Sequence, residues 1–248
     1  MEQNATLTKD KKGAINVSTF SQKIHSYLKH PFSLLVWIIT ILAALLTAAS
    51  FVYLVLYILI KGVPYLRPEL FSWTYDSNNV SMLPSIINTF LLTALSLVIS
   101  VPLGIFAAIY MVEYAKKGNR IVKFIRVTAE TLSGIPSIVY GLFGMIFFVG
   151  VLKMQLSLLS GSLTVAIMVL PTIMRTTEEA LLSVPQSYRE GSFGLGAGKL
   201  RTVFRIVLPS AVPGILSGVI LATGRIVGET AALIYTAGAA TKVAGGLF

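Results

Sequence analysis

Residues 31–60 read PFSLLVWIITILAALLTAASFVYLVLYILI, and none of these 30 side chains is Asp, Glu, Lys, Arg or His. An α-helix of about 20 apolar residues is long enough to cross the hydrocarbon core of a bilayer. Helices buried in soluble proteins are usually much shorter than this run. The stretch therefore predicts a membrane-spanning helix, and with it an integral membrane protein.

The rest of the chain repeats this composition. Stretches without Asp, Glu, Lys or Arg cover residues 77–112, 131–152 and 154–174, and residues 206–238 are interrupted only by Arg225 and Glu229. Of the 248 residues, 55% are hydrophobic and 12% are charged. So few charges do not cover the surface of a soluble domain of this size. We expect an all-α integral membrane fold with five spanning helices.

The basic residues are distributed according to the expected topology. They gather before the first span, between the second and third, and between the fourth and fifth: Lys9, Lys11, Lys12, Lys23 and Lys29; Lys116, Lys117, Arg120, Lys123 and Arg126; Arg189, Lys199, Arg201 and Arg205. The opposite side holds only Lys61, Arg67, Lys153 and Lys242. By the positive-inside rule the N-terminus is cytoplasmic.

The net charge of +10 does not indicate nucleic-acid binding, because the cations do not form one basic domain with interleaved aromatic residues. The chain has no cysteine, which excludes disulfides and thiolate metal sites. We divide it into a cytoplasmic tail (1–30), a first transmembrane helix (31–60), an external loop (61–84) and a core region (85–248). Within the core region, residues 179–205 form a polar cytoplasmic loop.

Small and hydroxylated residues open the third expected span. Ser133 and Ser137 are four residues apart, so on one continuous helix they share a face. Such a face suits a hydroxyl-lined wall of a solute pathway. It equally suits close helix packing, because membrane helix interfaces are rich in small residues.

Three charged residues lie within or beside the expected spans. Arg225 and Glu229 are four residues apart in the fifth span, and a charge at mid-membrane must be paired, hydrated or turned to a cavity. The guanidinium fork of arginine matches an oxyanion, so we predict that this pair lines the substrate pathway and that Arg175 supplies a second donor. The alternative is an ion pair that only fixes helix orientation, with Arg175 reaching to the cytoplasmic surface.

The loop between the fourth and fifth spans is polar but has helical signals. Pro185 is suited to begin a short helix, and the glycines at 194, 196 and 198 are suited to end it with a left-handed turn. A second amphipathic helix at 199–207 leads to Leu208-Pro209. We predict a helix-turn-helix beneath the membrane.

This loop resembles the signature of binding-protein-dependent ABC importer permeases, which is Glu-Ala-Ala, three residues, Gly, nine residues, then Ile-x-Leu-Pro. The matching residues of this chain are Glu190, Gly191, Ser192, Gly196, Ile206, Leu208 and Pro209. Gly191 and Ser192 replace the two alanines and are also small. The resemblance implies a MetI-like helical bundle in which residues 85–248 are the permease core. It also implies that the short helix docks into a groove of a cytoplasmic ATPase.

Residues 80–240 further resemble the phosphate permease subunits, in the segments 83–89, 133–141, 170–180 and 223–232. This resemblance implies a bacterial inner-membrane importer subunit that works with a homologous second permease subunit, a cytoplasmic ATPase dimer and an external phosphate-binding protein. Phosphate would be the solute. The chain itself would need no cofactor, because ATP and Mg²⁺ would be used by the ATPase. Phosphate permeases characteristically have six spans, so we also expect that a final helix is lacking here.

Three alternative functions can be weighed against the sequence. A membrane enzyme needs a reactive constellation, but His25 and His30 lie in the tail and the sequence has no Gly-x-x-x-x-Gly-Lys-Ser/Thr phosphate loop. A channel or secondary transporter would account for the intramembrane charges but not for the loop. A permease of the same architecture for molybdate, sulfate or a phosphonate remains open.

Overall fold

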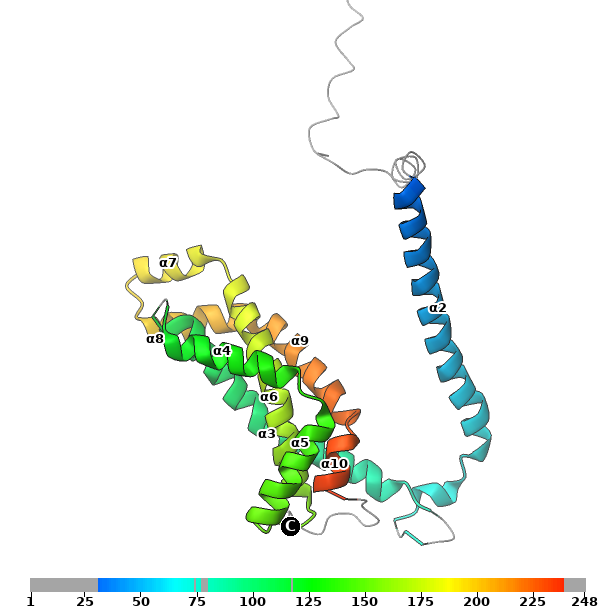
Figure 1. Ribbon diagram of the computed structural model, residues 1–248. Coiled ribbons are helices and arrows are strands. Elements are labelled where there is room, and N and C mark those ends of the chain that lie inside the picture. Colours follow the sequence, from blue (N-terminus) through cyan, green and yellow to red (C-terminus); the bar gives the residue numbers. More distant parts are fainter. Residues whose placement is uncertain (1–30, 74, 77–79, 117, 239–248) are drawn as a thin grey trace, which may run out of the picture. The chain divides into compact units, whose positions relative to one another are not determined.

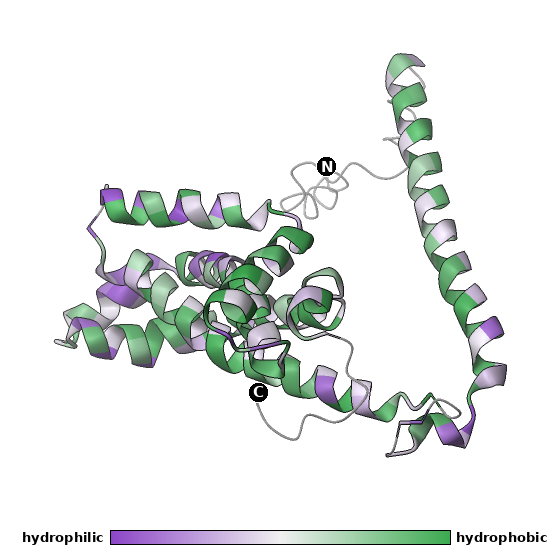
Figure 2. Cartoon of the chain, turned by 60° about the horizontal axis from the view of Figure 1, so that its bottom comes forward, coloured by the Kyte–Doolittle hydropathy of each residue, from purple (hydrophilic) through white to green (hydrophobic). Residues whose placement is uncertain are grey.

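The computed structural model describes residues 31–73, 75–76, 80–116 and 118–238, and the regular elements in these ranges are all helical. Two compact units, residues 1–66 and 67–248, are described separately. In the first, α2 (Pro31–Gly62) is followed by the short 3₁₀ helix η1 (Val63–Tyr65). Figure 2 shows that α2 is mostly hydrophobic along its length. The predicted tail, residues 1–30, lies outside the described residues.

The second unit is a bundle of helices joined by short connections (Figure 1). Its elements are η2 (Pro68–Phe71), α3 (Leu83–Ile109), the π-helical η3 (Tyr110–Tyr114), α4 (Arg120–Ser133), α5 (Ser137–Gly144), the π-helical η4 (Met145–Val151), α6 (Leu158–Ser183), α7 (Gln186–Gly194), α8 (Lys199–Thr202), the π-helical η5 (Val203–Val207), α9 (Leu208–Val227) and α10 (Ala231–Thr236). Residues 239–248 lie outside the described residues.

Among the described residues, four helices are long and apolar enough to cross a membrane: Pro31–Tyr65, Leu83–Tyr114, Leu158–Ser183 and Lys199–Val227. They lie where the first, second, fourth and fifth spans were expected. The third expected span is instead a pair of helices, Arg120–Ser133 and Ser137–Val151, that meet at a bend of 103°. The all-helical membrane fold is confirmed for the described residues, but a continuous third span is wrong.

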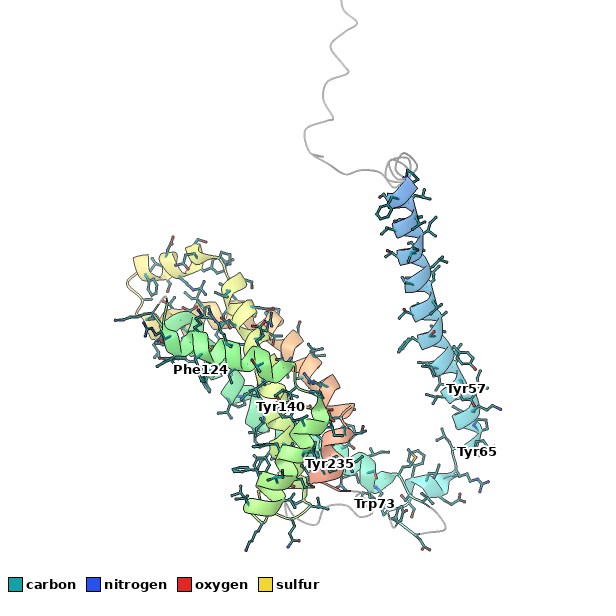
Figure 3. All side chains as sticks on the ribbon, viewed as in Figure 1. Tyr57, Tyr65, Trp73, Phe124, Tyr140 and Tyr235 are labelled. Carbon is teal, nitrogen blue, oxygen red and sulfur yellow. The ribbon has the colours of Figure 1, made fainter. Side chains whose placement is uncertain are left out.

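The bend between α4 and α5 has a local cause. Pro136 has an extended ψ of 141° and lacks the N–H that a continuing helix would use, and it disfavours helical geometry in the residue before it. Gly134 forms the C-cap of α4. Across the bend, the Tyr140 hydroxyl donates to the Leu132 carbonyl at 2.8 Å, which closes the corner (Figure 3).

Helix α6 lies at the centre of the bundle, with α3 and α9 packed against it. Glycines allow this close approach: a Cβ on Gly104 of α3 would lie 2.8 Å from Ile173, and one on Gly218 of α9 would lie 2.0 Å from the Thr176 hydroxyl. Gly214 meets Ala180 in the same way. Gly214 and Gly218 therefore form a packing surface on α9, because small residues let membrane helices approach closely.

Two buried apolar clusters hold the bundle together. One lies below α7 and α8: Ala108, Ile109, Met111, Val122, Met174, Ala180, Leu181, Val184, Val203, Val207, Ala211 and Ile215. The other surrounds the middle of α6: Leu92, Tyr140, Val165, Met168, Val169, Ile173, Ala222 and Ile226. In Figure 2 many of the hydrophilic residues of the bundle gather at the end that carries α7 and α8. Val203 and Val207 of η5, the segment that α7 contacts, belong to the first cluster.

Candidate functional site

The polar hairpin consists of α7, a glycine-rich turn and α8. Pro185 is the N-cap of α7, with an extended backbone that turns the chain out of α6. At the other end Gly196 has φ +81°, and its N–H donates to the Phe193 carbonyl at 2.9 Å. This left-handed conformation favours glycine, because a Cβ would collide with the backbone. The predicted helix-turn-helix is present at the predicted residues.

The two faces of α7 differ in character. Arg189 and Ser192 are buried against the bundle, whereas Glu190 and Gly191 are exposed. The outward face, spaced at helical intervals, consists of Ser187, Glu190, Gly191 and Gly194, all exposed. One carboxylate therefore stands among three small residues, and a Cβ on either glycine would meet nothing within 4 Å.

The other predicted coupling residues divide between packing and exposure. The Ser192 hydroxyl lies 2.8 Å from that of Thr202, so it ties α7 to α8 instead of facing outward. Ile206 and Leu208 are half-buried, the first in η5 and the second at the start of α9. Pro209 is exposed near the start of α9, within the continuous helical stretch Lys199–Val227.

A buried ion pair beneath α7 was not predicted from the sequence. The Arg189 guanidinium donates to Glu113 Oε1 from Nε at 3.0 Å and from Nη2 at 2.6 Å. The two side chains are 11% and 8% exposed. Glu113 lies in η3, 76 residues earlier in the chain, so spacing gives no signal of this contact. The only sequence hint is a carboxylate that directly follows a long apolar run.

A pocket of about 330 Å³ lies between α4 and α6, and we call it the α4–α6 pocket. It is lined by Arg126, Ala129, Glu130, Ser133, Pro171, Met174, Arg175, Glu178, Glu179 and Leu182. Ser133 and Arg175, two of the predicted pathway residues, meet here. Arg126 pairs with Glu178 at 2.5 Å, and Arg175 pairs with Glu179 at 3.3 Å.

The other predicted pathway residues are placed elsewhere. Ser137 begins α5, beyond the bend, so the expectation that it shares a helical face with Ser133 is wrong. Helix α9 ends at Val227, and Glu229 follows it, where its Oε1 accepts from the Ala232 N–H at 3.0 Å and begins α10. Within the described residues no ion pair joins Arg225 and Glu229, because the helix that would align them has already ended.

Arg225 is half-buried in the last turn of α9, and no ion pair holds it among the described residues. Its neighbours Ala222 and Ile226 are buried in the same apolar cluster as Tyr140. Cations are stabilised at helix C-termini, where the carbonyl groups point outward. The position therefore presents a guanidinium beside the bend without a compensating carboxylate. Among the described residues no group of three or more His, Asp or Glu side chains is placed to hold a metal ion.

Comparison with known proteins identifies the family. Residues 100–244 match the family model described as binding-protein-dependent transport system inner membrane component. The probable ABC transporter permease protein YqgI of Bacillus subtilis is 38% identical over 204 residues, which are 81% of this chain and 68% of that protein. The phosphate transport system permease protein PstA 1 of Mycobacterium tuberculosis is 41% identical over 142 residues, 57% of this chain and 46% of its own length.

The PstA protein of Haemophilus influenzae is 34% identical over 179 residues, with 71% of this chain and 63% of that protein covered. The chain thus spans about two thirds of YqgI and less than half of PstA 1. Among solved structures, the inward-facing MetNI methionine ABC transporter matches 59% of this chain and 68% of that chain at 21% identity and a TM-score of 0.49. The chain belongs to the family of binding-protein-dependent transport-system inner-membrane components.

Proposed function

We propose that this chain is the transmembrane permease subunit of an ATP-driven phosphate importer. It forms half of the translocation pathway, and a homologous second permease subunit forms the other half. Family membership supports the role of membrane component, and the relatives named phosphate transport system permease support phosphate as the solute. The observation that carries the proposal is α7, a short helix fixed to the bundle on one face and bare on the other.

The outward face of α7 suits insertion into a groove of a cytoplasmic ATPase dimer. Small residues at 187, 191 and 194 let a partner approach the helix backbone closely, and Glu190 offers a carboxylate to a basic partner group. Tyr188, Phe193 and Leu195 flank this face and are 51%, 47% and 91% exposed. Exposed apolar side chains at the polar end of a membrane protein mark a protein interface. In this arrangement the ATPase binds and hydrolyses Mg-ATP.

Replacing Glu190 with Lys tests the docking role. We expect the ATPase to dissociate from the complex or to hydrolyse ATP without phosphate uptake, because the new cation faces the basic group that the carboxylate contacted. Copurification of the subunits and uptake of labelled phosphate measure the two effects. Glu69→Lys makes the same charge change in η2 and serves as the control. Unaltered ATPase association together with unaltered uptake in Glu190→Lys contradicts the docking role.

Arg225 is the better supported of the two candidate anion contacts. In the α4–α6 pocket, which holds Arg175 and Ser133, three glutamates outnumber two arginines, so the pocket repels an anion. Arg225 has no carboxylate partner among the described residues, and its fork matches two phosphate oxygens. We assign Arg225 to direct contact, Ser137 to the pathway wall near the bend, and Glu229 to holding the end of α9 through α10.

The proposed orientation places the N-terminus, α7 and α8 on the cytoplasmic side, where the three groups of basic residues lie. An external phosphate-binding protein then delivers the solute to the opposite side. The absence of native cysteine permits a direct test with single cysteines. A Gln186→Cys variant should react with a membrane-impermeant maleimide only in inside-out vesicles, and reaction in intact cells contradicts this orientation.

A further inference from the structure

The guanidinium of Arg189 joins α7 to the end of the preceding helix α6 and to η3, which lies 76 residues earlier in the chain. Besides its two bonds to Glu113 of η3, it donates from Nη1 to the Val184 carbonyl at 2.9 Å and from Nη2 to the Leu181 carbonyl at 2.9 Å. Both carbonyls lie at the C-terminal end of α6, where backbone acceptors have no partner within the helix. One side chain of α7 thereby donates hydrogen bonds to the free carbonyls at the end of α6 and to the Glu113 carboxylate at the end of the second span.

The geometry of these bonds requires arginine in particular. Nε, Nη1 and Nη2 all donate at 3.0 Å or less, and the planar fork holds the three acceptors in fixed directions. A lysine has the charge but only one nitrogen on a flexible stem, so it cannot hold all three acceptors with this geometry. Burial of the pair also removes the competition from water that weakens exposed ion pairs.

A second contact ties the other end of α7. The bond between the hydroxyls of Ser192 and Thr202 connects α7 to α8, and α8 continues through η5 into α9. Helix α7 is therefore linked to α3 and α6 through Arg189 and to α9 through Ser192. These are the three helices that pack on one another in the bundle.

We infer that Arg189 is a positioning residue that fixes α7 to the ends of α3 and α6, so that a displacement of α7 is transmitted to both helices. This inference rests on the proposed function of α7 as the ATPase-docking helix. The adjacent residues Glu190 and Arg189 then have separate roles. Glu190 points toward the ATPase, while Arg189 points toward the helix bundle of its own chain. Without the Arg189 contacts, the link from α6 to α7 is the short extended segment at Val184 and Pro185, which can absorb a movement of α7.

The test measures coupling separately from assembly. Arg189→Gln and Glu113→Gln are placed in the full complex and reconstituted in lipid vesicles, with Lys123→Gln, an exposed cation of α4, as the control. We expect both variants to copurify with the ATPase and to hydrolyse ATP, while phosphate taken up per ATP falls at least about tenfold because the buried pair is broken. Lys123→Gln should keep the wild-type ratio. An assembled Arg189→Gln or Glu113→Gln complex with the wild-type ratio overturns the inference.

A structural measurement keeps the inference testable if uptake is lost for other reasons. Spin labels at Gln186→Cys on α7 and Leu103→Cys on α3, both exposed positions, report the separation of the two helices in the purified complex. We expect a narrow distance distribution with Arg189 and a broad one in Arg189→Gln or Glu113→Gln. Equal widths overturn the inference even if no variant transports. A wild-type complex that fails to transport phosphate refutes the proposed solute but leaves this comparison standing.

Discussion

Gly218 and Gly224 lie six residues apart on α9 and differ in their surroundings. A Cβ on Gly218 would lie 2.0 Å from the Thr176 hydroxyl of α6, whereas one on Gly224 meets nothing within 4 Å. We predict that Gly218→Ala destabilises the permease by about 1–3 kcal/mol, since overpacking forces neighbouring atoms to move. Gly224→Ala should be neutral or stabilise by up to about 1 kcal/mol through helix propensity. Thermal unfolding of the purified complex in detergent compares them, and equal melting temperatures contradict the packing of α9 on α6.

Replacing Arg225 is expected to change phosphate transport and not the stability of the protein. Its guanidinium is half-buried and lacks an ion-pair partner among the described residues, so it is available to an anion. We expect Arg225→Ala to lower phosphate uptake about tenfold or more, the loss that follows from one charge-assisted hydrogen-bonded contact. Assembly with the ATPase should be unchanged. Arg225→Lys keeps the positive charge but loses the planar guanidinium fork. Its phosphate uptake should lie between that of the wild type and that of Arg225→Ala.

Near-normal uptake by Arg225→Ala would remove this residue from the pathway. The matched variant Arg175→Ala distinguishes the two arginines, because Arg175 is exposed and already paired with Glu179. A larger loss in Arg175→Ala than in Arg225→Ala would move the anion contact to the α4–α6 pocket.

At the scale of single elements, the turn between α7 and α8 depends on one backbone conformation. Gly196 has φ +81°, and a left-handed residue with a Cβ costs about 1–2 kcal/mol. We predict that Gly196→Ala shifts α7 relative to α8 and weakens ATPase association about tenfold. Gly198→Ala in the same turn is the control, since Gly198 lies outside the docking face, has φ −72°, and its added Cβ meets nothing within 4 Å. Titration of the permease with the ATPase subunit measures both, and identical affinities contradict a strained turn.

The elements also show what the sequence can and cannot predict. Helix α7 was predictable because Pro185 and Gly196 act locally at its two ends. The break at Pro136 was not, because Pro102, Pro171 and Pro213 all lie inside continuous helices. Whether a proline ends a helix depends on neighbouring helices that supply partners for the freed backbone groups. The length of an apolar stretch in the sequence does not show whether neighbouring helices provide such partners.

The site residues differ in the same way. The outward position of Glu190 follows from local helix geometry, and its role in docking stays a prediction. The partner of Arg189 is 76 residues away, and only tertiary packing brings the two together. For Arg225 and Glu229 the four-residue spacing was misleading, because it predicts a contact only where one helix contains both residues.

At the scale of the whole chain, the helices leave much apolar surface for lipid and for other subunits. In the most apolar window of α6, 61% of residues are buried, compared with 28% or less in the other three long spans. Large apolar side chains such as Leu216, Ile220 and Leu221 on α9 are exposed. The role proposed above requires such surfaces, because half of a translocation pathway would contact both the bilayer and the proposed second permease subunit.

The most direct measurement is uptake of labelled phosphate into vesicles that carry the reconstituted complex. We predict accumulation that requires both Mg-ATP on the side of the ATPase and the phosphate-binding protein on the other side, and that excess sulfate, molybdate or a phosphonate does not suppress. Suppression by one of those anions reassigns the solute within the same architecture. Phosphate accumulation that proceeds equally without ATP or without the binding protein contradicts the account of this chain as an importer permease.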